Sequence, residues 1–266
     1  MNQLSLGEPS ATSGGSTLKL LVAYDGTEFH GFAAQRDART VEGVLTEALG
    51  RTLRGPVQLA CAGRTDAGVH AWGQVVTCPV SGDTDPLVVQ RSVSAQLGPE
   101  VVVRSAELVN GPFDARHSAT WRAYRYTIVN RDTPDPFRAR YAWWVHEALD
   151  LPRMRLAADP FLGEHDFASF CRKGPEGSTT VRTVLVSEWH DEGDGLLVYE
   201  VRATAFCWQM VRSIVGTLVD VGIGKITPGE ILAILRVRDR AVAGRIAPPN
   251  GLCLWEVGYE VGSVTA

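Results

Sequence analysis

The sequence predicts an α+β fold made of two ferredoxin-like halves, each an antiparallel sheet flanked by helices, with a central cleft between them. Two observations lead to this prediction. Strand and helix patterns alternate in the first half in the order β-α-β-β-α-β, which is the split pattern of ferredoxin-like domains. The second half has a similar outline, with strong strands around amphipathic helices.

The first half supplies six elements. A helix over residues 40–53 begins at a Thr N-cap and keeps apolar residues on one face. A second helix over residues 85–97 begins at Asp-Pro, because proline suits the first helical position. Alternating or continuous apolar runs predict strands over residues 18–24, 57–62, 74–80 and 101–109.

The second half has one long helix, over residues 208–221, with apolar side chains at core spacing. Shorter helices are predicted from about residue 152 and over residues 228–235. Strands are predicted over residues 121–129, 141–146, 184–189, 196–203 and 252–259.

Three segments follow from this pattern. Residues 1–16 are rich in Ser, Gly and Thr and are expected to be a flexible tail. Residues 17–112 would form the N-terminal ferredoxin-like domain. Residues 113–266 would form a C-terminal α+β domain that completes the cleft.

Composition narrows the class of protein. The net charge of −4 argues against a nonspecific nucleic-acid coat protein, yet it leaves room for a local basic groove. No apolar run approaches the ~18 residues of a membrane helix, and the first residues do not resemble a signal peptide. The five scattered cysteines lack a Cys-x-x-Cys pair, which argues against a disulfide framework and a zinc site. We therefore expect a cytoplasmic protein in a reducing compartment.

The most informative segment is the polar loop Gly-Arg-Thr-Asp-Ala-Gly-Val-His over residues 63–70, which follows an apolar strand. Rigid scaffolds commonly place chemistry on such loops. An ionised Asp66 could act as a nucleophile, a general base or the partner of a cationic transition state. The same residues would also suit a plain turn, in which Asp caps and Gly supplies a positive φ.

Residues 61–70 (CAGRTDAGVH) resemble the signature of the TruA family of tRNA pseudouridine synthases. The resemblance extends along the chain, because other blocks occur in the order that the family has. These blocks are residues 24–26, 41–45, 113–119, 124–126, 161–167, 182–184, 210–216 and 247–252.

The resemblance implies a pseudouridine synthase fold and a catalytic role for Asp66, which would attack C1′ of the uridine or take a proton from C2′. Arg212 would pair with Asp66, and Arg64 would enter the RNA helix where the target base leaves. Tyr124 would stack on the uracil, and its hydroxyl could help to move the C5 proton. Ordinary alternatives remain for these side chains: a solvated helix Arg, a salt-bridged Arg and a strand aromatic.

The resemblance also implies the partners. The substrate would be tRNA, modified at uridines 38, 39 and 40 of the anticodon stem-loop, and a homodimer would double the basic surface. Residues 112–140 hold six Arg against three Asp, which is a modest local excess. Substrate contacts are expected from Tyr124, Arg64, Arg116 and Arg182.

No cofactor is expected for this reaction, because nothing is oxidised and no group is imported. The sequence also lacks a Gly-rich phosphate loop or a dinucleotide fingerprint. No metal is expected either.

The chain departs from the family pattern in a few places. Phe32-Ala33-Ala34 stands where Trp is usual, Ser94 where Asn is usual and Cys253 where Tyr is usual. These departures affect expectations about local RNA contacts, and none removes a group that the chemistry requires.

Two rival functions fit parts of the pattern. A noncatalytic RNA-binding module can share the ferredoxin-like sheet, but it usually displays an aromatic string that is missing here. A hydrolase with paired carboxylates, such as a glycosidase or a metal-dependent nuclease, would need a second acid matched to Asp66.

Overall fold

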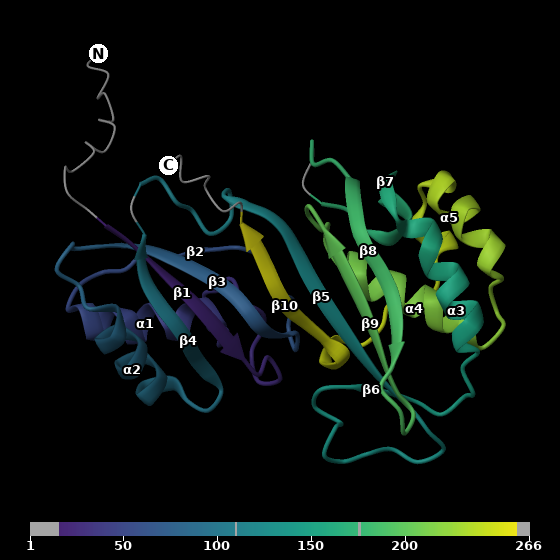
Figure 1. The fold of residues 1–266 in the computed structure, drawn as a ribbon, viewed down its shortest axis with the longest axis horizontal. Coiled ribbons are helices and arrows are strands. Elements are labelled where there is room, and N and C mark those ends of the chain that lie inside the picture. Colours follow the sequence, from purple (N-terminus) through teal and green to yellow (C-terminus); the bar gives the residue numbers. More distant parts are fainter. Residues whose placement is uncertain (1–15, 110, 175–176, 260–266) are drawn as a thin grey trace, which may run out of the picture.

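The computed structural model describes residues 16–109, 111–174 and 177–259. Its centre is one sheet in the order β4-β1-β3-β10-β5-β9-β8-β7, with β2 beside β3 and β6 beside β5 (Figure 1). The strands are β1 Ser16–Tyr24, β2 Ala60–Cys61, β3 His70–Val80, β4 Val101–Val109, β5 Ala119–Asn130, β6 Trp143–Val145, β7 Gly163–Asp166, β8 Val181–Asp191, β9 Leu196–Ala203 and β10 Leu252–Tyr259.

The helices begin at the capping residues that the sequence indicates in the first half. Thr40 accepts a hydrogen bond from the Gly43 N–H, and the Asp85 carboxylate accepts from the N–H of Leu87. Helices α1 and α2 lie against the first half of the sheet, and α3, α4 and α5 against the second (Figure 1). The helices are α1 Val41–Leu53, α2 Pro86–Leu97, α3 Leu151–Ala158, α4 Met210–Gly222 and α5 Ile231–Val237.

Both halves have the same strand order, β4-β1-β3-β2 in the first and β10-β5-β9-β8 in the second. The predicted order β-α-β-β-α-β of the first half is confirmed. The two sheets are merged into one, because β10 pairs in parallel with β3, with Cys253 opposite His70. One cluster of buried apolar side chains includes residues of both halves. The loop between β2 and β3 therefore lies where the halves meet.

Several element boundaries differ from the predictions. The predicted strand over residues 57–62 is reduced to Ala60–Cys61, and β7 was not predicted. Strand β3 starts at His70 instead of residue 74, because Gly73 lets the backbone of β10 approach. A Cβ on Gly73 would lie 2.2 Å from the Trp255 carbonyl oxygen. Helix α4 starts only after Gln209, whose left-handed backbone (φ 63°) interrupts the helix that the apolar spacing suggests.

The scattered cysteines indicated no disulfide framework, and the pairing of Cys171 with Cys207 was not predicted. These two form a disulfide, with Cα atoms 5.8 Å apart and a separation of 36 positions in the sequence. Sequence spacing carries no information about this pair, because the fold brings the segment before α4 next to the end of a short 3₁₀ turn at Ala168–Phe170. Among the described residues the other cysteines are free: Cys61, Cys78 and Cys253.

Of the predicted tail over residues 1–16, only Ser16 lies within the described residues, where it starts β1. The division between residues 112 and 113 stays a prediction. None of the helices among the described residues has the length and apolar character needed to cross a bilayer.

Candidate active site

The loop that carries Asp66 is held at its start by a buried glutamine. Gln74 in β3 is fully buried, and its Nε2 donates to the Gly63 carbonyl at 2.6 Å. Its Oε1 accepts from the Gly63 N–H at 3.4 Å. The hydroxyls of Tyr24 and Thr65 are hydrogen-bonded at 2.8 Å. Strands β1 and β3 therefore fix the backbone immediately before Asp66.

The other side of the loop is held by the turn after β1. The Phe32 N–H donates to the Thr65 carbonyl at 3.0 Å, and the Gly68 N–H donates to the Phe29 carbonyl at 3.2 Å. Gly31 has a φ of +92°, and a Cβ there would lie 2.8 Å from the Thr65 carbonyl oxygen. Phe32, which departs from the family pattern, is buried beneath this turn. The Asp66 loop is thus fixed from both sides by backbone contacts.

The Asp66 carboxylate has a separate partner for each oxygen. Oδ2 lies 3.2 Å from Arg212 Nη1, and Oδ1 accepts from the indole Nε1 of Trp208 at 3.0 Å. The Asp66 side chain is 27% exposed and that of Arg212 is 15% exposed. The carboxylate is therefore oriented by two donors and still open to solvent on one side.

Arg212 is fixed by the segment that runs along α4. Its Nε donates to the Ala247 carbonyl at 2.8 Å, and the Ala247 N–H returns a bond to the Arg212 carbonyl at 3.0 Å. The segment can approach α4 this closely because residue 216 is a glycine. A Cβ on Gly216 would lie 1.8 Å from the Arg245 carbonyl oxygen. One side of the guanidinium thus binds backbone while the other meets Asp66.

Tyr124 lies in β5 and faces the Asp66 loop. A Cβ placed on Gly63 would lie 3.6 Å from the Tyr124 hydroxyl oxygen. The ring meets Phe206 edge-on, with centroids 4.9 Å apart. Burial raises the pKa of Tyr124; the charge of Arg122 opposes this rise and that of Asp66 adds to it. The hydroxyl therefore keeps its proton at neutral pH.

Arg64 and Arg116 lie on the outer side of this region. Arg64 is exposed, and among the described residues no hydrogen bond or ion pair holds its side chain. Arg116 is exposed as well, and its carbonyl accepts from Arg122, which also donates to the Ala62 carbonyl. The Arg122 guanidinium thus ties the Arg116 segment to the start of the Asp66 loop.

Arg182 stands apart from these groups. It lies in β8, where its Nη1 donates to the carbonyl of the neighbouring Val181 at 2.6 Å. Its Nε is buried without a hydrogen-bond partner among the described residues. No contact described for Arg182 reaches Asp66, so the structure does not bring this predicted substrate contact into the carboxylate cluster.

His70 occupies a structural position at the end of the loop. Its Nδ1 accepts from the Gly26 N–H at 3.0 Å, and its Nε2 lies 2.9 Å from the Arg140 carbonyl oxygen. Both contacts are satisfied by a neutral ring that donates from Nε2. Burial lowers the pKa of His70 and outweighs the charge of Asp25, whose Oδ1 lies 3.2 Å from Nδ1, so the ring stays neutral at pH 7.

Sequence reasoning missed Gln74 and Trp208. Gln74 sits within an apolar strand, where a polar residue signals a buried hydrogen-bonding role. Trp208 belongs to the apolar pattern that was assigned to the helix, so nothing in the sequence separated it from the core.

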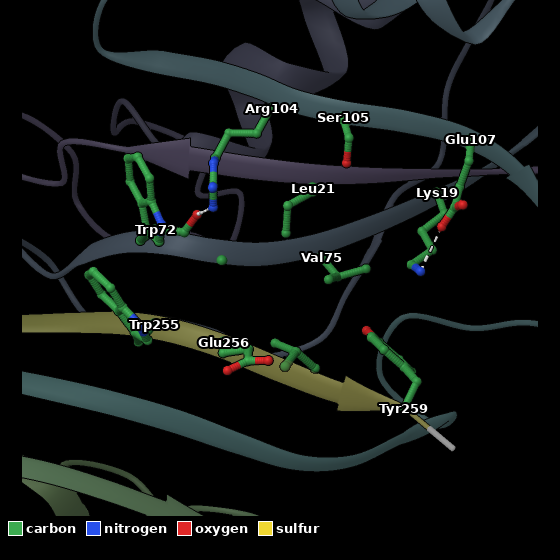
Figure 2. Close-up of a pocket in the computed structure, with 12 residues that line it drawn as sticks. Lys19, Leu21, Trp72, Val75, Arg104, Ser105, Glu107, Trp255, Glu256 and Tyr259 are labelled. Carbon is green, nitrogen blue, oxygen red and sulfur yellow. Dashed lines mark hydrogen bonds and ion pairs between the residues drawn. The ribbon is translucent and has the colours of Figure 1, made fainter. Parts of the chain in front are cut away.

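A pocket of about 390 Å³ lies on the other face of the sheet. Lys19 and Leu21 line this pocket, whereas the intervening Leu20 is buried towards the helices. Figure 2 shows Trp72 and Trp255 at one end of it, with Arg104 beside Trp72. Asp66 is not among the lining residues, so this pocket is separate from the carboxylate cluster.

Comparison with known proteins agrees with the resemblance seen in the motifs. Residues 20–116 and 157–260 match the profile of the family described as tRNA pseudouridine synthase. The chain is 42% identical to tRNA pseudouridine synthase A of Leifsonia xyli over 94% of both chains. It is 38% identical to tRNA pseudouridine synthase A of Bacillus subtilis, over 91% of this chain and 99% of that protein.

The comparison with solved structures includes distant likenesses. An archaeal box H/ACA sRNP Nop10-Cbf5 complex is 14% identical over 76% of this chain and 44% of the other, with a TM-score of 0.34. That likeness adds nothing to the assignment, which the sequence matches carry. The mixed α+β fold fits the pseudouridine synthase fold, and the enzymes of this class are isomerases. The chain belongs to the tRNA pseudouridine synthase family.

Proposed function

We propose that this protein converts uridine to pseudouridine at positions 38, 39 and 40 in the anticodon stem-loop of tRNA, with Asp66 as the catalytic carboxylate. The observation that carries the proposal is the Asp66 carboxylate, oriented by Arg212 at 3.2 Å, at the junction of the two halves of a chain from this family.

The conversion of uridine to pseudouridine requires a carboxylate in a fixed position. The N1–C1′ bond of the uridine breaks, the uracil turns, and C5 bonds to C1′ before the C5 proton leaves. Asp66 either attacks C1′ and is later displaced, or takes the C2′ proton and later returns it. Both routes use the ionised carboxylate, and its negative charge stabilises positive charge that develops on the sugar.

Three other side chains support the substrate in this scheme. Arg64 is exposed and unpaired among the described residues. Its side chain is therefore available to enter the RNA helix at the position that the uridine leaves. Tyr124 presents its ring and a protonated hydroxyl beside Gly63. Arg116 and Arg182 would bind phosphates further along the RNA.

A homodimer is part of the proposal. Trp72, on the sheet face away from Asp66, is 46% exposed and stacks on Trp255 with centroids 6.1 Å apart. Arg104 covers Trp72 and Arg125 covers Trp255, at 3.9 and 4.2 Å. An exposed row of Arg and Trp suits contact with a second copy. The proposed location of the enzyme is the cytoplasm, where its tRNA would be.

The test is tritium release from tRNA labelled at uridine C5, with wild type and Asp66→Ala side by side and EDTA present. The proposal expects release by the wild type alone and equal tRNA binding by both. Mapping of the modified positions would then test 38, 39 and 40. No release by either protein, on unmodified tRNA that binds, would contradict the enzyme assignment and favour the RNA-binding module.

A further inference from the structure

The segment just before α4 makes three consecutive contacts that converge on the site. Phe206 packs edge-on against Tyr124, Cys207 is bonded to Cys171, and Trp208 donates its indole N–H to Asp66 Oδ1 at 3.0 Å. Gln209 then turns the chain with a φ of 63°, so the helix begins after this segment. The segment is thereby free to face the Asp66 loop.

Trp208 is held in place by more than its own hydrogen bond. The Arg172 guanidinium covers the indole ring at 4.1 Å, and the Arg172 N–H donates to the Trp208 carbonyl at 2.9 Å. The disulfide at the neighbouring Cys171 joins the same two stretches of chain. A tryptophan that is 47% exposed is thus fixed at its ring face, its backbone and its N–H.

We propose that Trp208 is a positioning residue, whose indole N–H fixes one oxygen of the Asp66 carboxylate while Arg212 fixes the other. This inference rests on the proposed role of Asp66. A carboxylate rotates readily about its last bond, and its two oxygens exchange places when it does. Donors at both oxygens hold the carboxylate plane, so that one lone pair stays directed at the sugar of the bound uridine.

The two donors differ in the charge that they place beside the Asp66 carboxylate. Arg212 carries a charge, whereas the indole N–H is neutral and can only donate. Trp208 therefore orients the carboxylate without a second positive charge beside it. Loss of its N–H should lower the rate of the chemical step and leave tRNA affinity unchanged.

The experiment measures kcat and KM for tritium release from C5-labelled tRNA. Trp208→Phe keeps a ring but removes the N–H, and we expect its kcat to fall about tenfold with KM unchanged within about twofold. Trp208→His restores a ring N–H at the corresponding atom, and we expect it to recover most of the rate. The matched control is Trp144→Phe, because Trp144 is 42% exposed and its N–H donates to the Arg131 carbonyl at 2.9 Å.

The outcomes separate this inference from the proposed function. Three results would overturn the positioning role. They are a wild-type kcat in Trp208→Phe, an equal loss of kcat in Trp208→Phe and Trp208→His, and a change confined to KM. In each case Asp66→Ala in the same assay still tests the proposed function. Activity that survives in Asp66→Ala would contradict the catalytic role of Asp66 itself. Circular dichroism and tRNA binding of both Trp208 variants show whether they are folded.

Discussion

Arg212 Nη1 lies 3.2 Å from Asp66 Oδ2, although the two residues are 146 positions apart in the chain. The contact crosses the junction between the halves, because Asp66 follows β2 and Arg212 lies in the first turn of α4. It depends on Ala247, whose carbonyl binds the Arg212 Nε and sets the direction of the guanidinium.

Arg212→Lys is expected to slow turnover severely while the protein stays folded. A lysine cannot bind the Ala247 carbonyl and the carboxylate with the same planar group, so about 2 kcal/mol of orientation, or about thirtyfold in kcat, should be lost. The control is Arg245→Lys. Arg245 lies outside α4, and its Nε pairs at 3.1 Å with Asp220, which is in the same helix as Arg212. Equal kcat values for the two variants would show that the pair with Asp66 does not matter.

Gln74→Leu should destabilise the fold and loosen the Asp66 loop. The side chain is fully buried and binds both the N–H and the carbonyl of Gly63. Leaving these backbone groups without partners should cost about 2 kcal/mol in the free energy of unfolding, measured in urea. Gln90→Leu removes one bond, to the Arg104 carbonyl, and should cost less than about 1 kcal/mol. The idea fails if both variants unfold at the same urea concentration.

Tyr124→Phe should separate chemistry from stability. The Tyr124 hydroxyl has no hydrogen-bond partner among the described residues, so its removal should leave the melting temperature nearly unchanged. If the hydroxyl moves the C5 proton, turnover should fall about a hundredfold. Tyr199→Phe should behave in the opposite way, because the Tyr199 hydroxyl binds Ser187 at 2.7 Å in the core. If Tyr124→Phe releases tritium at the wild-type rate, the hydroxyl does not move the C5 proton, and only the ring of Tyr124 contributes to turnover.

The stability of the protein should depend on pH through His70. Burial lowers the pKa of His70 below its usual 6.5, so the unfolded chain binds this proton more readily than the folded chain. The stabilisation is therefore present above pH 6.5 and is lost as the pH falls through the folded pKa. Urea unfolding between pH 7.5 and pH 5, at ~0.5-unit steps, measures the slope.

His70→Gln is the matched variant for this slope. Glutamine offers an acceptor to the Gly26 N–H but does not titrate, so the variant should be less stable at pH 7.5 and show a shallower acid slope. His146→Gln is the control, because that side chain is 65% exposed. An acid slope that is identical in wild type and His70→Gln would assign the pH dependence to other groups.

The affinity for tRNA should weaken as salt is added, because phosphate contacts release counterions. Arg116→Ala should weaken binding at low salt and reduce the slope of log K against log salt by about one. Lys225→Ala should leave the slope unchanged, because Lys225 follows α4 and its Nζ lies 4.0 Å from Asp220 Oδ1. An affinity that stays flat across a broad titration would contradict a phosphate-based interface.

Much of the first half was predictable from the sequence, because its signals are local. Thr40 and Asp85 cap the helices they were expected to cap, and the apolar strands follow in the predicted order. The same local logic failed at Gly73, where the close approach of β10 lengthens β3. It also failed at Gln209, whose left-handed backbone delays α4.

The sequence by itself determined the family, the Asp66 loop and the types of group that could act there, because each is encoded in contiguous residues. Only the tertiary structure decided which groups meet. It joins the halves through the parallel pair of β3 and β10, and it brings Arg212 and Trp208 to opposite oxygens of Asp66. It also leaves Arg182 outside that cluster. Contacts across more than a hundred residues depend on how the halves pack, and no periodicity or spacing within the chain records that packing.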